Sequence, residues 1–189
     1  MSNPPSLKLT NSTRLWVAAD MIDPPFANQL IFDGSGAFEL DKLENAISMA
    51  SAANPGSRYV LRGMLGSSRW VDSGVTPRLR VVDGAGWDGM GPEGAPACLR
   101  ESLSVASGPS CEVVVITGSP LRIVFRSHHG IMDGRGTLTW AEDIFRALRG
   151  EPVTGSDPML CEYDLLNISK GKIERAISYL YGAPTGRAT

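Results

Sequence analysis

Two apolar segments joined by a short turn, with a pair of histidines at the end of the second, restrict the possible folds of this chain more than any other feature. Residues 112–117 are almost continuously apolar, as is typical of a strand buried on both faces. Residues 121–127 follow after a Gly-Ser-Pro turn, and we expect the two segments to form a hairpin. Beyond the histidines, apolar residues recur at every third or fourth position as far as Gly150, which predicts a helix. The sequence therefore predicts a buried hairpin that leads directly into a helix.

The two histidines, His128 and His129, are the only ones in the 189 residues. Successive side chains of a strand point to opposite faces, so His129 is expected to continue the face of Phe125 while His128 points the other way. One histidine should then enter a cleft and the other should pack behind it. Asp133 and Gly134 follow and supply a carboxylate and a turn glycine. A histidine at a strand end, held by a turn and a helix start, can act as a general base.

Residues 128–134 read H-H-x-x-x-D-G, and this segment resembles the signature motif of the acyltransferase superfamily that includes chloramphenicol acetyltransferase and the condensation domains of nonribosomal peptide synthetases. The resemblance covers residues 10–150. It implies formation of an amide or ester bond from a thioester donor and an amine or alcohol acceptor. The donor would be an acyl-CoA or the phosphopantetheine thioester of a carrier protein, and no permanently bound cofactor is implied. The sequence does not specify which donor or acceptor is used.

The resemblance also implies a role for each residue of the motif. His129 corresponds to the catalytic histidine, and His128 and Gly134 complete the motif around it. Asp133 is expected to be architectural, because the family pairs this aspartate with an arginine upstream. Arg62 lies where condensation domains carry that arginine, so we expect Arg62 to pair with Asp133 and to support the loop that holds His129.

Two neighbours of the motif are candidates for contact with substrate. Arg135 would place a positive charge near the mouth of the site and favour an acidic substrate or carrier, although a solvated arginine on the first turn of a helix is the simpler interpretation. Ser127 adjoins His128, but it lacks the strained G-x-S-x-G turn that exposes a nucleophile. Direct transfer is therefore favoured over an acyl-enzyme intermediate.

Two other kinds of site can be set aside on the sequence. Residues 84–89 spell G-x-G-x-x-G after a candidate strand, but a dinucleotide site requires a helix next, and prolines at 92 and 96 interrupt that segment. We therefore expect a surface loop. Adjacent histidines cannot easily bind one metal, and no cysteine pair or H-E-x-x-H motif completes a site, so no metal is expected.

Further elements can be predicted from apolar patterns and breakers. Asp41, with Glu44 three residues later, predicts a capping box at the start of a helix that ends at Asn54-Pro55-Gly56. The remaining segments with strand patterns are residues 14–20, 28–38, 59–65, 69–72 and 78–83.

Composition excludes several classes of partner. With 18 basic and 20 acidic residues the net charge is -2, which favours neither nucleic acid nor an anionic membrane surface. No apolar run approaches the roughly 18 residues of a spanning helix, and the N-terminus lacks the pattern of a secretory signal. Cys98, Cys111 and Cys161 are odd in number and not paired in spacing, which is typical of a reducing cytoplasm.

These observations predict an α/β (α+β) fold like one half of a chloramphenicol acetyltransferase-like enzyme, with a mixed, largely antiparallel sheet and helices packed on one side. We expect a flexible arm at 1–12, an acyltransferase-like subdomain at 13–150, and a linker with a C-terminal helix at 151–189. In condensation domains the motif lies in the first of two similar halves. The resemblance therefore implies a complementary C-terminal half, a companion chain or self-association. The alternative is a non-catalytic module that docks a carrier protein or companion chain.

Overall fold

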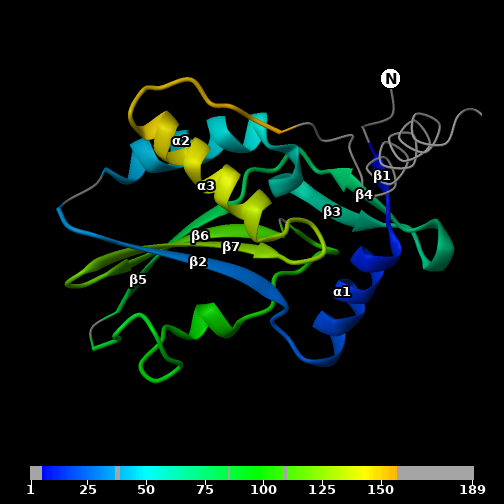
Figure 1. The fold of residues 1–189 in the computed structure, drawn as a ribbon, viewed down its shortest axis with the longest axis horizontal. Coiled ribbons are helices and arrows are strands. Elements are labelled where there is room, and N and C mark those ends of the chain that lie inside the picture. Colours follow the sequence, from blue (N-terminus) through cyan, green and yellow to red (C-terminus); the bar gives the residue numbers. More distant parts are fainter. Residues whose placement is uncertain (1–5, 37–38, 85, 109, 157–189) are drawn as a thin grey trace, which may run out of the picture. The chain divides into compact units, whose positions relative to one another are not determined.

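The computed structural model describes residues 6–36, 39–84, 86–108 and 110–156 (Figure 1). Within these ranges the helices are α1 (Asn11–Ile22), α2 (Leu40–Ala53) and α3 (Gly134–Leu148). The strands are β1 (Ser6–Lys8), β2 (Ala27–Gly34), β3 (Tyr59–Arg62), β4 (Arg69–Asp72), β5 (Arg78–Asp83), β6 (Cys111–Thr117) and β7 (Leu121–His128). Short 3-10 turns span Pro55–Arg58, Leu65–Ser67 and Ala97–Arg100.

The strands form two sheets. The larger has the order β2-β7-β6-β5, in which β5 and β6 run parallel and the other neighbours run antiparallel. The smaller has the order β1-β4-β3 and is antiparallel. β6 and β7 form the expected hairpin, in which Val114 lies opposite Val124. The expectation of a mixed, largely antiparallel architecture is confirmed.

Helices α2 and α3 lie on one face of the larger sheet (Figure 1). Their buried residues meet those of β6 and β7 in one core, which includes Leu43, Ile47, Phe125, Trp140 and Ile144. Each large apolar side chain buried in this way contributes roughly 1.5–3 kcal/mol. The ring nitrogen of Trp140 donates a hydrogen bond to the hydroxyl of Ser51 at 3.1 Å, so its burial leaves no polar atom unsatisfied.

The segment between β5 and β6 packs on the opposite face of the same sheet. Trp87 and Leu99 from this segment form a second core cluster with Val114 and Val124 of the sheet. Gly89 has a φ of 87°, which favours glycine, and a Cβ there would lie 2.6 Å from Nε of Arg122, so that the guanidinium would have to shift. In the described part of residues 84–96 no helix follows the glycines, which confirms a loop in place of a dinucleotide site.

The N-terminal region differs from the prediction. Residues 14–20 were expected to form a strand, but they belong to helix α1, whose N-cap is Thr10 with its hydroxyl accepting from the amide of Thr13 at 3.3 Å. A short apolar run does not distinguish helix from strand by periodicity, and here the cap decides. The arm expected at 1–12 is also wrong in part, because Leu7 pairs with Trp70 in the smaller sheet.

Helix α2 is present as predicted, but its start is not a capping box. The helix begins at Leu40, and Glu39 occupies the N-cap without a side-chain cap hydrogen bond. Asp41 therefore lies in the first turn, where its charge is favourable beside the positive end of the helix.

The linker expected from residue 151 is fixed to the helices over its first part. The carboxylate of Asp143 accepts hydrogen bonds from the amides of Thr154 and Gly155 at 2.7 and 2.8 Å and from the side chain of Asn54 at 2.8 Å. Within the described residues, β1 (Ser6–Lys8) and residues 151–156 thus belong to the body of the fold. The remainder of the linker and the expected C-terminal helix lie outside the described residues.

Candidate active site

The H-H-x-x-x-D-G segment connects the end of β7 to the start of α3. The carbonyl of His128 accepts a hydrogen bond from the amide of Ile131 at 3.0 Å, which closes a turn directly after the strand. Asp133 is the N-cap of α3, and its carboxylate accepts from the amide of Gly136 at 2.7 Å. Gly134 is the first residue of the helix. The predicted order of strand, turn and helix is therefore present.

His128 is completely buried and is bonded within its own turn. Its Nδ1 accepts a hydrogen bond from the amide of Gly130 at 3.0 Å. Its Nε2 lies 3.7 Å from a carboxylate oxygen of Asp20 on α1. Burial lowers the pKa of His128 below its usual value, the charge of Asp20 opposes this shift, and His129 adds to it. His128 is therefore a neutral residue that packs behind the site, as the sequence predicted for one of the two histidines.

We expect the burial of His128 to make stability depend on pH. The unfolded chain binds a proton at this residue below about pH 6.5, whereas the folded chain binds it only at lower pH. Because the unfolded state then holds more protons, the free energy of unfolding should fall as the pH is lowered through about 6.5. Urea unfolding at pH 7.5 and pH 5.5 measures the difference.

A control variant isolates the contribution of His128. In His128→Gln the side chain keeps an acceptor for the Gly130 amide but no longer titrates, so the difference between the two pH values should shrink. Against the opposing effect of burial, hydrogen bonds lower the pKa values of Asp72 and Asp143, so these residues lose their contribution to the free energy of unfolding only below about pH 4. They therefore do not affect the comparison between pH 7.5 and pH 5.5. Equal stability of the wild type at the two pH values would contradict a neutral, buried His128.

His129 lies in the turn after β7 and packs on two aromatic rings. Its imidazole stacks on Trp16 of α1, with ring centroids 4.7 Å apart and an interplanar angle of 12°, and on Phe26, at 5.8 Å and 18°. Its amide donates to the carbonyl of Phe26 at 3.0 Å. The ring is half-buried, and its Nδ1 is buried without a hydrogen-bond partner. His129 is thus the more exposed of the two histidines, and its aromatic contacts, rather than strand alternation, determine where its ring lies.

Trp16, Asp20 and Phe26 were not predicted as site residues. A strand would also place Trp16 and Asp20 on one face, but about 13 Å apart. In the helix they lie about one turn apart, and the face that they share is directed at the histidines. The N-cap signal at Thr10 could have indicated the helix, but not its contact with the histidines.

The expected ion pair between Arg62 and Asp133 is not formed. Arg62 is exposed at the end of β3, and its guanidinium donates to the carbonyls of Leu61 and Ala106 at 3.0 and 2.6 Å. The carboxylate of Asp133 is engaged as the helix cap. The prediction is wrong because β3 belongs to the smaller sheet and its end bonds to the neighbouring segment instead.

Other groups hold the loop in place of that pair. The side-chain amide of Asn28 on β2 donates to the carbonyl of Met132 at 2.7 Å. The hydroxyls of Ser127 and Thr137 are 2.6 Å apart, and Ser127 is completely buried, so it is not accessible to a substrate as proposed from the sequence. Arg135 is exposed on the first turn of α3, in agreement with the simpler interpretation of a solvated arginine.

The structure predicts that Arg62 and Asp133 act independently. Asp133→Ala should cost about 1 kcal/mol through loss of the helix cap, and Arg62→Ala should cost less because its bonds are exposed. In a double-mutant cycle on the free energy of unfolding, the two effects should add to within about 0.5 kcal/mol. A larger coupling would show that the side chains meet in solution.

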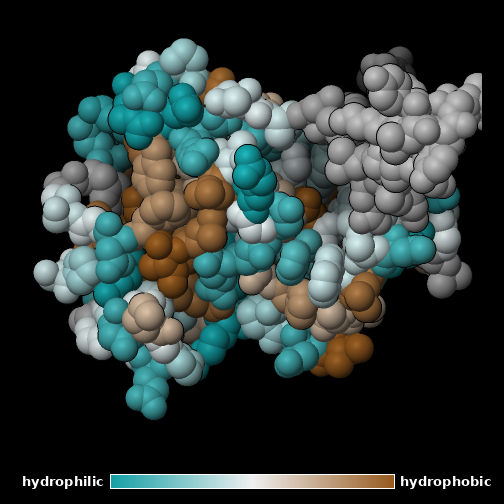
Figure 2. All heavy atoms as spheres, viewed as in Figure 1, coloured by the Kyte–Doolittle hydropathy of each residue, from teal (hydrophilic) through white to brown (hydrophobic). Residues whose placement is uncertain are grey.

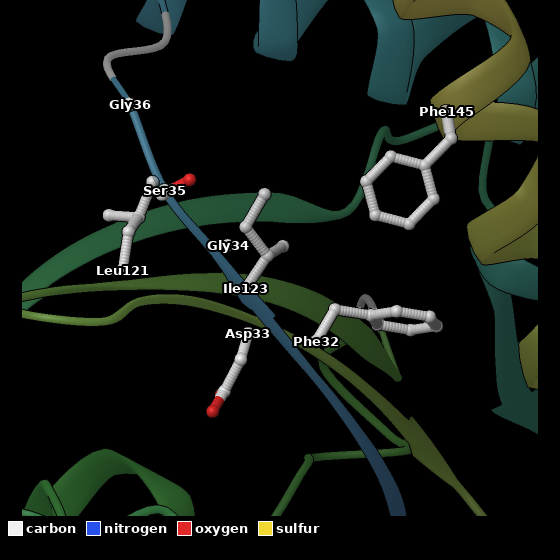
Figure 3. Close-up of a pocket in the computed structure, with 8 residues that line it drawn as sticks. All are labelled: Phe32, Asp33, Gly34, Ser35, Gly36, Leu121, Ile123 and Phe145. Carbon is white, nitrogen blue, oxygen red and sulfur yellow. The ribbon is translucent and has the colours of Figure 1, made fainter.

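An apolar pocket lies near the other end of β7. It encloses about 300 Å³, and Phe32, Leu121, Ile123 and Phe145 contribute its apolar side chains (Figure 3). Ile123 is six residues before His129, which corresponds to roughly 20 Å along an extended strand. The pocket is thus separate from the histidines.

Comparison with known proteins gives a fold but no match in sequence. No protein-family model matches the chain, and no curated protein matches it. Among solved structures it is similar to the condensation domain of the monacolin K polyketide synthase MokA, with a TM-score of 0.67 and 14% identity over 99% of this chain and 45% of that one. It is also similar to the starter condensation domain of the rhizomide synthetase RzmA in complex with C8-CoA, with a TM-score of 0.65 and 19% identity over 93% of this chain and 44% of that one. A third similar structure is the epimerization domain of the third module of tyrocidine synthetase B, with a TM-score of 0.65 and 14% identity over 98% of this chain and 46% of that one.

The chain therefore has the fold of a condensation domain over slightly less than half of such a domain's length. This confirms the expected α/β architecture, which resembles one half of a chloramphenicol acetyltransferase-like enzyme. Within the described residues no group of three or more potential metal ligands occurs, and no helix has the length and apolarity needed to cross a membrane.

Proposed function

We propose that the chain is one half of a condensation-type acyltransferase, in which His129 acts on the acceptor substrate. The observation that carries this proposal is the contrast between the two histidines. His128 is completely buried and its Nδ1 accepts from the amide of Gly130, whereas His129 is half-buried, stacked on Trp16 and Phe26, and its Nδ1 has no hydrogen-bond partner within the described residues. The fold of condensation domains supports the same interpretation.

The proposed reaction needs one proton acceptor and no acyl-enzyme. The amine or hydroxyl of the acceptor attacks the thioester carbonyl, the new C–N or C–O bond forms, the C–S bond breaks, and the thiol leaves with a proton. Neutral His129 accepts the acceptor's proton, or orients a neutral amine by hydrogen bonding, and returns the proton to the thiolate. No carboxylate of the described residues lies within 4 Å of the His129 ring, so the bound substrate itself would select the ring tautomer.

We propose a CoA or carrier-protein thioester as the donor. The RzmA starter condensation domain is described in complex with C8-CoA, and in another structure with C8-CoA and Leu-SNAC. These are one acyl donor and one thioester-linked amine. A role in nonribosomal peptide or related metabolism would follow. The free, buried thiols of Cys98 and Cys111 fit the reducing cytoplasm where CoA thioesters occur.

We further propose that a second half completes the site, either as a companion chain or as a second copy. Helix α1, which carries Trp16, has no buried residue and exposes the apolar side chains of Leu15, Met21 and Ile22. Apolar side chains also gather between α3 and the edge strand β2 (Figure 2). Surfaces of this kind in proteins often mark interaction sites. The second half would exclude water and position the two substrates.

Amide formation tests the proposal. The chain is incubated with C8-CoA and Leu-SNAC, alone and after co-expression with the products of the adjacent coding sequences, and the C8-leucyl amide is quantified by mass spectrometry. We expect amide that depends on the protein and increases with the second half. Tight binding of C8-CoA without any amide would instead favour the non-catalytic docking module. That alternative is supported by the absence of the Arg62–Asp133 pair and of a carboxylate beside His129.

A further inference from the structure

The carboxylate of Asp20 faces two N–H groups from different parts of the chain. One oxygen accepts a hydrogen bond from the backbone amide of Phe26 at 2.6 Å. The other lies 3.7 Å from Nε2 of His128. The side chain of Asp20 is 14% exposed, so these contacts are largely shielded from water. Asp20 thus connects helix α1 to the start of β2 and to the end of β7.

The hydrogen bond at the other side of His128 determines where the ring proton lies. Nδ1 accepts from the amide of Gly130 and therefore carries no hydrogen. A neutral imidazole has one N–H, so the proton of His128 is on Nε2 and is directed at Asp20. A carboxylate suits this position because both of its oxygens accept, one for each N–H group.

Both groups that face Asp20 are in direct contact with His129. Phe26 accepts the amide hydrogen of His129 at 3.0 Å and lies against its ring. His128 precedes His129 in the chain. Asp20, Phe26, His129 and His128 therefore form a closed circuit of contacts. Trp16, the second ring under His129, lies one helical turn before Asp20 on the same helix.

We propose that Asp20 is a positioning residue for His129, which it places by accepting from the Phe26 amide and facing Nε2–H of His128 at the same time. The significance for catalysis rests on the acyltransferase function proposed above. The placement of the His129 ring does not depend on that function, because it can be measured in the protein without any substrate.

Asp20→Asn is the most informative substitution. Asparagine has the same size, but only one of its two terminal atoms accepts a hydrogen bond. If that oxygen accepts from the Phe26 amide, the NH₂ group faces Nε2–H of His128, and two donors oppose each other. Asp23→Asn is the matched control, since it makes the same change in charge three residues further along, at an exposed position.

Ring nitrogen resonances provide a readout that needs no activity. The chain has two histidines, so a ¹H–¹⁵N spectrum of the imidazoles contains two rings, and His129→Gln assigns them. In the wild type we expect His128 as the Nε2–H tautomer. In Asp20→Asn the resonances of both rings should move, whereas in Asp23→Asn they should stay in place. An Nδ1–H tautomer of His128 in the wild type would overturn the proposal, and this result does not depend on whether the variant folds.

Kinetics then separate positioning from general destabilisation. With C8-CoA and Leu-SNAC, Asp20→Asn should lower kcat by about 10- to 100-fold with little change in KM, as displacement of a reacting group does. Unchanged ring resonances, or unchanged kcat in a variant whose rings have moved, would overturn the positioning role. If the wild type forms no amide, the proposed function fails, and the ring spectra alone decide whether Asp20 places His129.

Discussion

Glu112→Gln is expected to lower the free energy of unfolding by about 3–5 kcal/mol, because it leaves a buried arginine without its counter-charge. Glu112 on β6 is completely buried, and its carboxylate forms ion pairs with Arg126, which is also completely buried, with Arg78 at 2.5 Å and with Arg80 at 3.2 Å. Arg80 also pairs with Glu101 and Arg78 is half exposed, so Arg126 is the arginine that depends on the buried carboxylate.

The substitution preserves shape and changes charge. Glutamine fills the same space, but its NH₂ group faces guanidinium donors, and Arg126 keeps only its hydrogen bonds to carbonyls such as that of Cys98. Urea denaturation measures the loss. Glu101→Gln is the control. Glu101 also pairs with Arg80, but its side chain is 49% exposed, so the substitution should lower the free energy of unfolding by less than about 1 kcal/mol. Similar costs for both variants would show that the buried carboxylate is not essential.

Most of the larger sheet and its two helices could be predicted from the sequence. β6 and β7 are buried on both faces or nearly so, and such strands produce continuous apolar runs between turn residues. Helices α2 and α3 each bury one side, which gives a helical period. Helix α1 has no buried residue, so the burial pattern from which a helix is inferred is absent there.

The candidate site could be predicted only where it is local in sequence. The motif at residues 128–134 singled out His128, His129 and Asp133 as candidates, but it gave Asp133 as the partner of Arg62 rather than as the helix cap that it is. Trp16, Asp20 and Phe26 are more than a hundred residues away in the chain, and no local pattern indicates that they meet the histidines. The Arg62–Asp133 pair was inferred from a resemblance, and it failed because ion pairing depends on tertiary geometry.

His129→Ala is expected to lower the rate of acyl transfer by about 10²- to 10⁴-fold, the range for loss of a group that transfers a proton. The fold should remain intact. Nδ1 of the imidazole has no hydrogen-bond partner within the described residues, and the lost contacts with Trp16 and Phe26 are worth about 0.5–1.5 kcal/mol each. The melting temperature should therefore fall by several degrees, at about 2–4 °C per kcal/mol, without loss of the fold. Arg62→Ala is the control, because its guanidinium bonds to Leu61 and Ala106 and should not affect transfer.

The central claim is that this chain contributes the proton-accepting side of an acyl-transfer site. The most direct test is the initial rate of C8-leucyl amide formation by the wild type and by His129→Ala, at saturating C8-CoA and Leu-SNAC and in the presence of the second half. We predict a wild-type rate at least about 100-fold above that of the variant, measured at a temperature where both proteins are folded. Equal rates in two folded proteins would contradict the claim and leave His129 as a packing residue on Trp16 and Phe26.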